Sequence, residues 1–233
     1  MNFKIHNYND FCEELMSSGF SMGGGNTEGI YGIIPFSWDN TPDGTDIKWH
    51  TGDKETDPWE WRIRVLDERN DIAYSKLFFN KSGYITKDWY AYFLAVRRNG
   101  QTFEQAYMDG TMSNFAKRIY ELICDNEVLP LHAIKQLGGF SKEDKSKFDR
   151  ALTDLQMKMF VTMCGRQQKL SKKGEEYGWS STVFCTTEHF FDKDVFNHAD
   201  SLSALEASEK ITAQIYTLNP NADNKKIKKF IGG

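Results

Sequence analysis

The sequence lacks any apolar stretch long enough to cross a membrane. Its 233 residues contain no run approaching the roughly 20 apolar residues that a transmembrane helix needs. The N-terminal sequence, MNFKIHNYNDFCEEL, also lacks the basic segment followed by an apolar segment that is typical of a secretion signal. These absences exclude a membrane-spanning protein, and we expect a cytoplasmic protein without a membrane partner.

Cysteine is scarce and scattered. The four cysteines, Cys12, Cys124, Cys164 and Cys185, form no CxxC pair, so neither a disulfide scaffold nor a structural zinc site is expected. Cys164, Cys185 and His189 are the best metal candidates, but cysteines on neighbouring strands are more often packed side chains, and we expect no metal. The sequence also lacks a GxSxG elbow and a GxxxxGK[ST] phosphate-binding loop, and no cofactor is expected.

Positive charge is not in overall excess. The chain has 29 Lys and Arg against 33 Asp and Glu, a net charge of -4, which excludes a uniformly basic nucleic-acid binder but not a local basic patch. Residues 1–60 contain eleven acidic residues and three lysines, a net charge of -8, whereas residues 142–173 contain nine basic and four acidic residues, a net charge of +5. A solvated surface and a phosphate-binding surface both fit the second pattern, so the fold has to decide between them.

Residues 1–110 predict an aromatic-rich α+β region. Asn9 is the expected cap of its first helix and Gly19 the end, while Asp57 followed by Pro58 is typical of a helix start. The apolar spacing predicts, in order, a helix over 9–18, a strand over 30–34, a helix from Pro58 to about Asp67, a hairpin of strands 72–79 and 84–86, and a helix over 87–98.

Residues 111–190 predict a winged helix-turn-helix core. Three helices are expected over 113–125, 130–137 and from a Ser141 cap to about 159, followed by a strand over 160–163, a polar loop over 165–178 and a strand over 179–186. In a winged helix the third helix can enter the major groove while the hairpin contacts phosphates. The basic excess falls on these two elements, so DNA contact is favoured, although Asp144, Asp149 and Asp154 would repel phosphate.

The remaining segment, 191–233, predicts C-terminal helices. One is expected over 200–217, Asn219 and Pro220 break it, and a short lysine-rich helix follows. The fold class predicted for the whole chain is therefore α+β, with a winged-helix core between an aromatic N-terminal part and C-terminal helices.

Several strings, in this order, resemble the AlkZ-related family, winged-helix proteins allied to AlkZ/YcaQ-type bacterial DNA glycosylases. These are Trp49-His50 followed by Asp57-Pro58-Trp59-Glu60-Trp61-Arg62, then Ala73-Tyr74-Ser75-Lys76-Leu77, Leu152-Thr153-Asp154-Leu155-Gln156 and Gly178-Trp179-Ser180-Ser181. The resemblance covers residues 30–190. It implies a DNA-associated protein that removes alkylated bases or is a non-catalytic relative. The Gln-apolar-Gln or Gln-apolar-Asp motif of the glycosylases is not found, since Gln156-Met157-Lys158 ends in lysine.

The segment from Trp49 to Arg64 has the residue types that a base-excision site needs, namely stacking rings and a carboxylate. We predict Asp57 or Glu60 as the catalytic carboxylate. Trp49, His50, Trp59, Trp61 and Arg62 are the predicted stacking or pocket residues. A structural explanation stays open, because Asp57 can be a helix cap and Trp59 and Trp61 point about 200° apart on a helix.

The predicted DNA-binding residues are Lys145, Arg150, Lys158, Arg166, Lys169 and Lys172. The partner we expect is duplex DNA, damaged DNA included. The alternative is a non-enzymatic winged-helix regulator or interaction module, whose acidic, aromatic N-terminal part would bind a partner or a small ligand.

Overall fold

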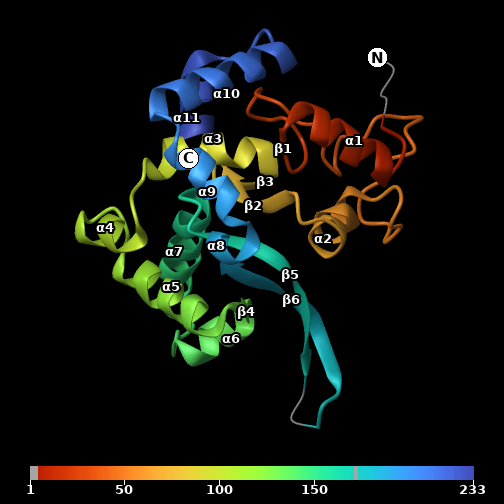
Figure 1. Cartoon of the computed structure of the whole chain (residues 1–233). Helices are drawn as coiled ribbons and strands as arrows, with labels where there is room; N and C mark the ends of the chain where they lie inside the picture. The colour runs from red at the N-terminus through yellow and green to blue at the C-terminus, as the bar shows by residue number, and fades with distance from the viewer. Residues whose placement is uncertain (1–4, 171–172) are drawn as a thin grey trace. The chain divides into compact units, whose positions relative to one another are not determined.

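The structure, a computed structural model, describes residues 5–170 and 173–233. The chain divides into two compact units, which are coloured by residue number in Figure 1. Unit 1 comprises Met1–Gly100 with Lys193–Gly233, and unit 2 comprises Gln101–Asp192. Both contain helices and antiparallel strands, so the predicted α+β class is confirmed.

Unit 1 joins a three-stranded sheet to six helices in its described part. The sheet order is β1-β3-β2, antiparallel throughout, with Phe20 opposite Ile85 and Ala73 opposite Ile85 on the other side. The elements are α1 (Tyr8–Ser18), β1 (Phe20–Met22), α2 (Pro58–Glu68), β2 (Ile72–Phe78), β3 (Lys81–Thr86), α3 (Lys87–Arg98), α9 (Lys193–Asp200), α10 (Ala204–Leu218) and α11 (Asn224–Gly232).

Helix α1 begins earlier than predicted. The side chain of Asn7 accepts a hydrogen bond from the Asp10 amide and caps the helix, so the prediction of Asn9 as the cap was wrong. Asn9 instead lies within the first turn, where its side-chain amide donates to Glu13. The predicted end is correct, because Gly19 adopts the left-handed conformation (φ 87°) that glycine allows at a helix C-terminus.

The apolar run 30–34 does not form the predicted strand. It is a buried loop, with Ile30, Ile33 and Ile34 each at most 6% exposed. Its backbone pairs with the glycine-rich segment instead: the Met22 amide donates to the Tyr31 carbonyl, and the Gly25 amide donates to the Ile34 carbonyl. Burial thus explains the hydrophobicity, and the neighbouring segment Phe20–Met22 is the edge strand.

The hairpin β2–β3 turns one position earlier than the predicted loop. Phe79 and Asn80 both have positive φ angles, 52° and 61°, as the central residues of a two-residue hairpin turn of the primed type do. Gly83 lies on β3, where an added Cβ would come within 2.5 Å of the Phe78 ring. The close approach of that ring explains why glycine occupies the strand.

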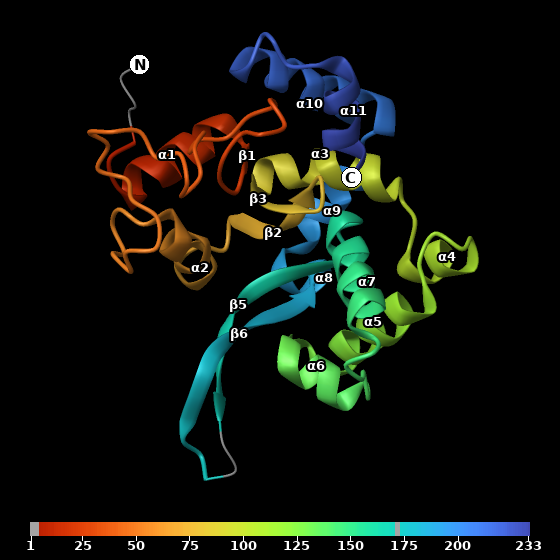
Figure 2. The same ribbon diagram turned by 180° about the vertical axis from the view of Figure 1, so that it is seen from behind.

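The core of unit 1 is aromatic and centres on α3. Phe20, Phe78, Phe93 and Phe230 surround one another, and the Phe78 and Phe230 rings stack at 3.9 Å. Helices α9, α10 and α11 pack on α3, as Figures 1 and 2 show from opposite sides. The C-terminal segment therefore completes the core that the N-terminal segment begins. The helix predicted over 200–217 is α10, which begins at Ala204 because the Ser203 capping box starts it there, and α9 before it was not predicted.

Unit 2 contains five helices in its described part, four before a long hairpin and one after it. Its core is formed by buried residues of α5, α7, β5 and β6, among them Ile119, Phe148, Leu155 and Val161. The strand order is β4-β6-β5, antiparallel. The elements are α4 (Phe103–Met108), α5 (Asn114–Asn126), β4 (Val128–Pro130), α6 (Leu131–Leu137), α7 (Lys145–Met157), β5 (Val161–Leu170), β6 (Glu176–Thr186) and α8 (Thr187–Phe190).

The hairpin is longer than predicted. Most of the predicted polar loop over 165–178 belongs to β5 and β6, with Arg166 opposite Thr182 and Lys169 opposite Tyr177. A strand with polar residues on both faces shows no alternating hydrophobic pattern, so the sequence does not reveal it. Backbone pairing with the neighbouring strand still stabilises it. Figure 1 shows the two strands as a ribbon that extends past α6.

Helix α7 begins at Lys145, and Ser141 is not its cap. The Ser141 amide and hydroxyl both donate to the Asp144 carboxylate at 2.9 Å, which closes a turn before the helix. Thr153 is buried on this helix at 8% exposed, and its hydroxyl donates to the Asp149 carbonyl. In the described part of the chain, no helix combines the length and the apolarity that crossing a membrane requires.

Candidate functional site

Asp57 organises the loop that precedes α2. Its side chain is fully buried, and four backbone amides donate to its carboxylate. Oδ1 accepts from His50 at 3.1 Å and from Trp59 at 2.8 Å, while Oδ2 accepts from Thr51 at 2.8 Å and from Gly52 at 2.9 Å. Four donors match the acceptor capacity of a carboxylate, so Asp57 holds the loop and the first turn of the helix together.

Glu60, the other predicted carboxylate, lies in the first turn of α2 and is half-buried. The positive end of the helix dipole stabilises a negative charge at this position. The catalytic roles predicted for Asp57 and Glu60 stay predictions.

The Asp57 loop places aromatic and cationic side chains in a row. The His50 ring lies 4.8 Å from the Trp59 ring and 6.4 Å from the Trp49 ring. The Arg62 guanidinium lies over the Trp59 ring at 3.5 Å from its centroid, and Arg62 Nε donates to the Trp59 carbonyl. Four of the five predicted stacking residues are thus brought together, and Trp59 remains 43% exposed. We call Trp49, His50, Trp59 and Arg62 the aromatic row.

Trp61 does not join the aromatic row. Its side chain is fully buried, and its ring lies 5.0 Å from the Phe11 ring and 6.3 Å from the Tyr8 ring. Successive odd positions on a helix point in nearly opposite directions, so Trp59 faces solvent while Trp61 anchors α2 to α1.

A hollow of about 400 Å³ lies beside the aromatic row. Trp38 and Trp49 line it together with Lys48 and the loop over 41–45. Trp38 is 69% exposed, which is unusual for so large an apolar side chain. Trp38 was not among the predicted site residues; a tryptophan in a polar Asp-, Thr- and Gly-rich loop is the signal that could have identified it.

In unit 2, lysines surround a second hollow, of about 310 Å³, at the start of α7. Lys135 of α6, Lys142 of the turn and Lys145 of α7 line it, with the Phe140 and Phe148 rings as its apolar wall. We call these three residues the lysine hollow. Lys145 was predicted as a DNA-binding residue, whereas Lys135 lies outside the basic window and only the fold brings it here.

The other predicted DNA-binding residues are spread over α7 and the hairpin. Arg150 has an 85% exposed side chain, and its Nε lies 3.9 Å from the Asp154 carboxylate. Lys158 is half-buried at the end of α7. Arg166 is exposed and Lys169 half-buried on β5. Lys172 lies outside the described residues.

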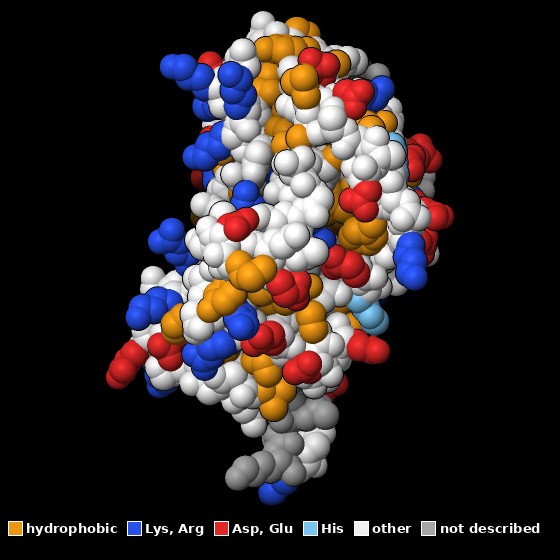
Figure 3. All heavy atoms as spheres, turned by 60° about the vertical axis from the view of Figure 1, so that its left-hand side comes forward, with side chains coloured by type: hydrophobic (Ala, Val, Ile, Leu, Met, Phe, Trp, Pro, Cys, Tyr) orange, Lys and Arg blue, Asp and Glu red, His pale blue; other side chains and the backbone are white. Residues whose placement is uncertain are grey.

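Acidic side chains accompany the basic ones. Lys135 lies 4.0 Å from the Asp149 carboxylate, and hydrogen bonds from Ser141 hold the pKa of Asp144 below its usual value. Figure 3 shows blue Lys and Arg side chains and red Asp and Glu side chains sharing one face of the molecule. Neighbouring carboxylates thus offset part of the positive charge of these side chains.

Cys164 and Cys185 meet across the hairpin, where their thiols are hydrogen-bonded. Residues 5–170 and 173–233 contain no group of three or more His, Cys, Asp and Glu side chains that is arranged to hold a metal ion. Cys185 is buried, and Cys164 is half-buried.

Compared with known protein families, the sequence matches the family described as AlkZ related over residues 5–232. The chain belongs to the AlkZ-related family. The match spans both units, and it extends the resemblance found in residues 30–190 to nearly the whole chain. Comparisons with curated proteins and with solved structures find no match.

Proposed function

We propose that this AlkZ-related protein binds duplex DNA through unit 2, used as a winged helix. Helices α5, α6 and α7 precede the hairpin β5–β6 in the order of that fold. In a winged helix the third helix approaches the major groove by its N-terminal residues, and the hairpin contacts the adjacent backbone. The corresponding elements here are the first turns of α7 and the long polar ribbon of β5 and β6.

The observation that carries this proposal is the lysine hollow at the start of α7. Lys135, Lys142 and Lys145 come from three consecutive segments and line one concave surface. A phosphate placed there would meet ammonium groups together with the positive end of a helix of 13 residues. The nearby Asp149 offsets part of this charge, so about two to three phosphate contacts are expected.

Four further cations, on α7 and the hairpin, extend the proposed footprint. Arg150, Arg166 and Lys169 are assigned to backbone contacts, with Lys158 at the buried end of α7 as a weaker contributor. Arg150 is the candidate for reading a base edge, because its long, 85% exposed side chain can pair with guanine in the major groove.

Unit 1 supplies the proposed link to damaged DNA. The exposed Trp59 ring with Arg62 above it, and the hollow between Trp38 and Trp49, offer flat apolar surfaces that suit a nucleobase. A protein that acts on a base must hold that base outside the helical stack. We assign the aromatic row to stacking such an extruded base.

A non-enzymatic DNA-binding role is the second candidate. It is favoured by Asp57, whose carboxylate already accepts four backbone hydrogen bonds and so has little capacity to activate water. If the protein removes bases, Glu60 is the remaining predicted carboxylate. An assay of base release from alkylated duplex, with E60Q as the comparison, separates the two roles.

The test of DNA binding is the salt dependence of affinity for a fluorescent duplex. The triple variant K135A/K142A/K145A should bind more weakly and flatten the slope of log K against log salt by about two units. The control K210A/K225A/K228A removes the same charge from exposed lysines of α10 and α11 in unit 1. Equal losses in both variants, or no loss in the first, would overturn the assignment.

The repair role is tested with a duplex that contains an abasic-site analogue opposite a free base. Wild-type protein should prefer it to plain duplex, and W59A should lose this preference while binding plain duplex normally. Y216A, which removes another partly exposed ring from unit 1, is the matched control. A preference that survives in W59A contradicts the stacking role.

A further inference from the structure

Unit 1 also contains a cavity whose lining overlaps that of the hollow beside the aromatic row only at residues 42–45. It has a volume of about 760 Å³ and lies among α1, the loop over 31–36 and the loop over 42–46. That volume falls within the range of small-molecule sites, which is about 300–1,000 Å³. The residues of the aromatic row do not line it.

One wall of the cavity is apolar and well ordered by the fold. Ile5, Ile33 and Phe36 line it and are each 5–6% exposed. The loop that carries them is fixed, because the Ser21 hydroxyl accepts from the Ile33 amide at 3.0 Å and the Gly25 amide donates to the Phe36 carbonyl at 3.2 Å. A bound ligand would therefore meet a preformed apolar surface.

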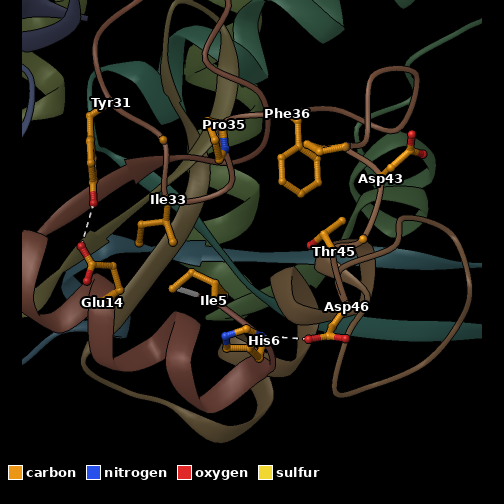
Figure 4. Close-up of a pocket in the computed structure, with 13 residues that line it drawn as sticks. Ile5, His6, Glu14, Tyr31, Ile33, Pro35, Phe36, Asp43, Thr45 and Asp46 are labelled. Carbon is orange, nitrogen blue, oxygen red and sulfur yellow. Dashed lines mark hydrogen bonds and ion pairs between the residues drawn. The ribbon is translucent and has the colours of Figure 1, made fainter. Parts of the chain in front are cut away.

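Two carboxylates stand at the sides of this wall. Glu14 Oε1 accepts a hydrogen bond of 3.0 Å from the Tyr31 hydroxyl, and Asp46 Oδ2 lies 2.8 Å from His6 Nδ1. Figure 4 shows these two pairs on different sides of the cavity, with Ile5 and Ile33 between them. Burial and the nearby Glu14 raise the pKa of Tyr31, so the phenol keeps its proton and remains the donor.

Each of these carboxylates retains one oxygen without a partner. Among the described residues, no hydrogen bond or ion pair involves Glu14 Oε2 or Asp46 Oδ1. Asp43 adds a third carboxylate to the lining, which contains no Lys or Arg in the described chain. The cavity thus joins an apolar wall to three carboxylates, of which Asp46 is paired with His6, and it lies in the acidic part of the sequence.

From this arrangement we propose that the cavity binds a small organic ammonium ion, with its apolar body against Ile33 and Phe36. Its ammonium group would donate to the open oxygens of Glu14 and Asp46, and Phe36 would also offer a ring face to the cation. The site goes beyond the DNA contacts proposed above because its ligand is different, and of the residues that carry it only Asp43 also lines the hollow beside the aromatic row.

The test uses phenethylammonium as the probe and 3-phenylpropionate and benzyl alcohol as its anionic and neutral counterparts. Ligand-observed NMR titrations of the full chain measure the three affinities. Phenethylammonium should bind at least tenfold more tightly than either counterpart. Equal binding of all three would show only an apolar hollow, and no binding of the cation at about 10 mM would also overturn the proposal.

Charge-neutral variants locate the binding. E14Q and D46N keep the shape of each side chain and should each weaken phenethylammonium binding about three- to tenfold, while the double variant should lose the preference for the cation. E13Q, which neutralises the exposed neighbour of Glu14 on α1, is the matched control and should bind as wild type does. Wild-type affinity in E14Q/D46N would place the probe elsewhere.

Two control measurements accompany these titrations. Circular dichroism melts confirm that each variant is folded, and DNA affinity is measured in parallel so that failure of one proposal can be told from failure of the other.

Discussion

The guanidinium of Arg97 donates a hydrogen bond of 2.9 Å from Nε to the backbone carbonyl of Ile231. A second bond of 2.9 Å runs from its Nη2 to the carbonyl of Phe230. Both acceptors lie at the end of α11, where a helix leaves its carbonyls without intrahelical partners. Arg97 therefore ties α3 to the C-terminal helix through groups that would otherwise be buried and unsatisfied.

Replacing Arg97 should destabilise unit 1. Burial lowers the pKa of Arg97, and its charge is tolerated there because the two carbonyls and the faces of the Phe78 and Phe93 rings surround it. We expect R97A to lower the free energy of unfolding by about 2–4 kcal/mol in urea titrations. K225A, an exposed change on α11, should have an effect below about 0.5 kcal/mol. An equally small effect of R97A would show that α11 is held by its apolar face alone.

Replacing Asp57 should lower the stability of the protein, because its carboxylate holds the loop before α2. D57A removes the cap of α2 and three further backbone hydrogen bonds, so we expect a loss of about 2–3 kcal/mol in the free energy of unfolding. Faster amide hydrogen exchange at Thr51 and Gly52 should accompany it. D67A, an exposed carboxylate on the same helix, serves as the control. Unchanged exchange in D57A would contradict the positioning role.

The Arg69–Asp71 ion pair predicts a pH dependence of stability. Two hydrogen bonds, of 2.8 and 2.7 Å, join the guanidinium to the carboxylate and lower the pKa of Asp71. Because the pKa of Asp71 is lower in the folded than in the unfolded protein, the ion pair stabilises the fold fully at pH values above the unfolded pKa of about 3.9. This contribution is lost as the pH falls from there through the folded-state pKa. D71N should therefore cost about 1 kcal/mol at pH 7, and the difference from wild type should shrink below about pH 4. A difference that stays constant with pH would point to a packing effect of the amide.

Thiol reactivity should separate the four cysteines. Cys124 is exposed, whereas Cys12 and Cys185 are buried. Burial raises the pKa of Cys12 and of Cys124, and the hydrogen bond with Cys164 together with burial raises that of Cys185, so exposure rather than pKa distinguishes Cys124 from the two buried thiols. Titration of the native protein with Ellman's reagent should show one fast thiol, which C124A removes. A fast phase that remains in C124A would indicate that a cysteine assigned to the interior is accessible.

Local chemistry was sufficient for many elements. The Asp57-Pro58 start of α2, the Gly19 end of α1 and the apolar face of α3 were predicted from sequence, because each depends on residues within a few positions of one another. Predictions failed where the hydrophobic pattern did not match the backbone pairing. The 30–34 run is apolar and was predicted as a strand, but it is a buried loop. The outer part of the hairpin β5–β6 is polar and was predicted as a loop, but cross-strand pairing makes it two strands.

Part of the candidate site was predictable because its residues lie close together in sequence. Trp49, His50, Trp59 and Arg62 lie close in sequence, and the aromatic row follows from the Asp57 turn that gathers them. Helical geometry predicts that Trp61 points away from Trp59, but it does not predict that Trp61 contacts Phe11 and Tyr8. Trp38 and Lys135 lie far from the selected residues along the chain, so only folding brings them to the two hollows.

The sequence by itself determined the α+β class, the bounds of α1, α2, α3, α5 and α6 to within one residue, and the family, because these depend on local spacing and on ordered motifs. Tertiary structure alone decided that residues 193–233 complete the core of unit 1, where Phe230 stacks on Phe78. It alone assembled the lysine hollow and the acidic cavity, since each joins side chains from separate segments. Long-range burial selects such contacts by shape and by apolar area, neither of which is encoded within any single stretch of sequence.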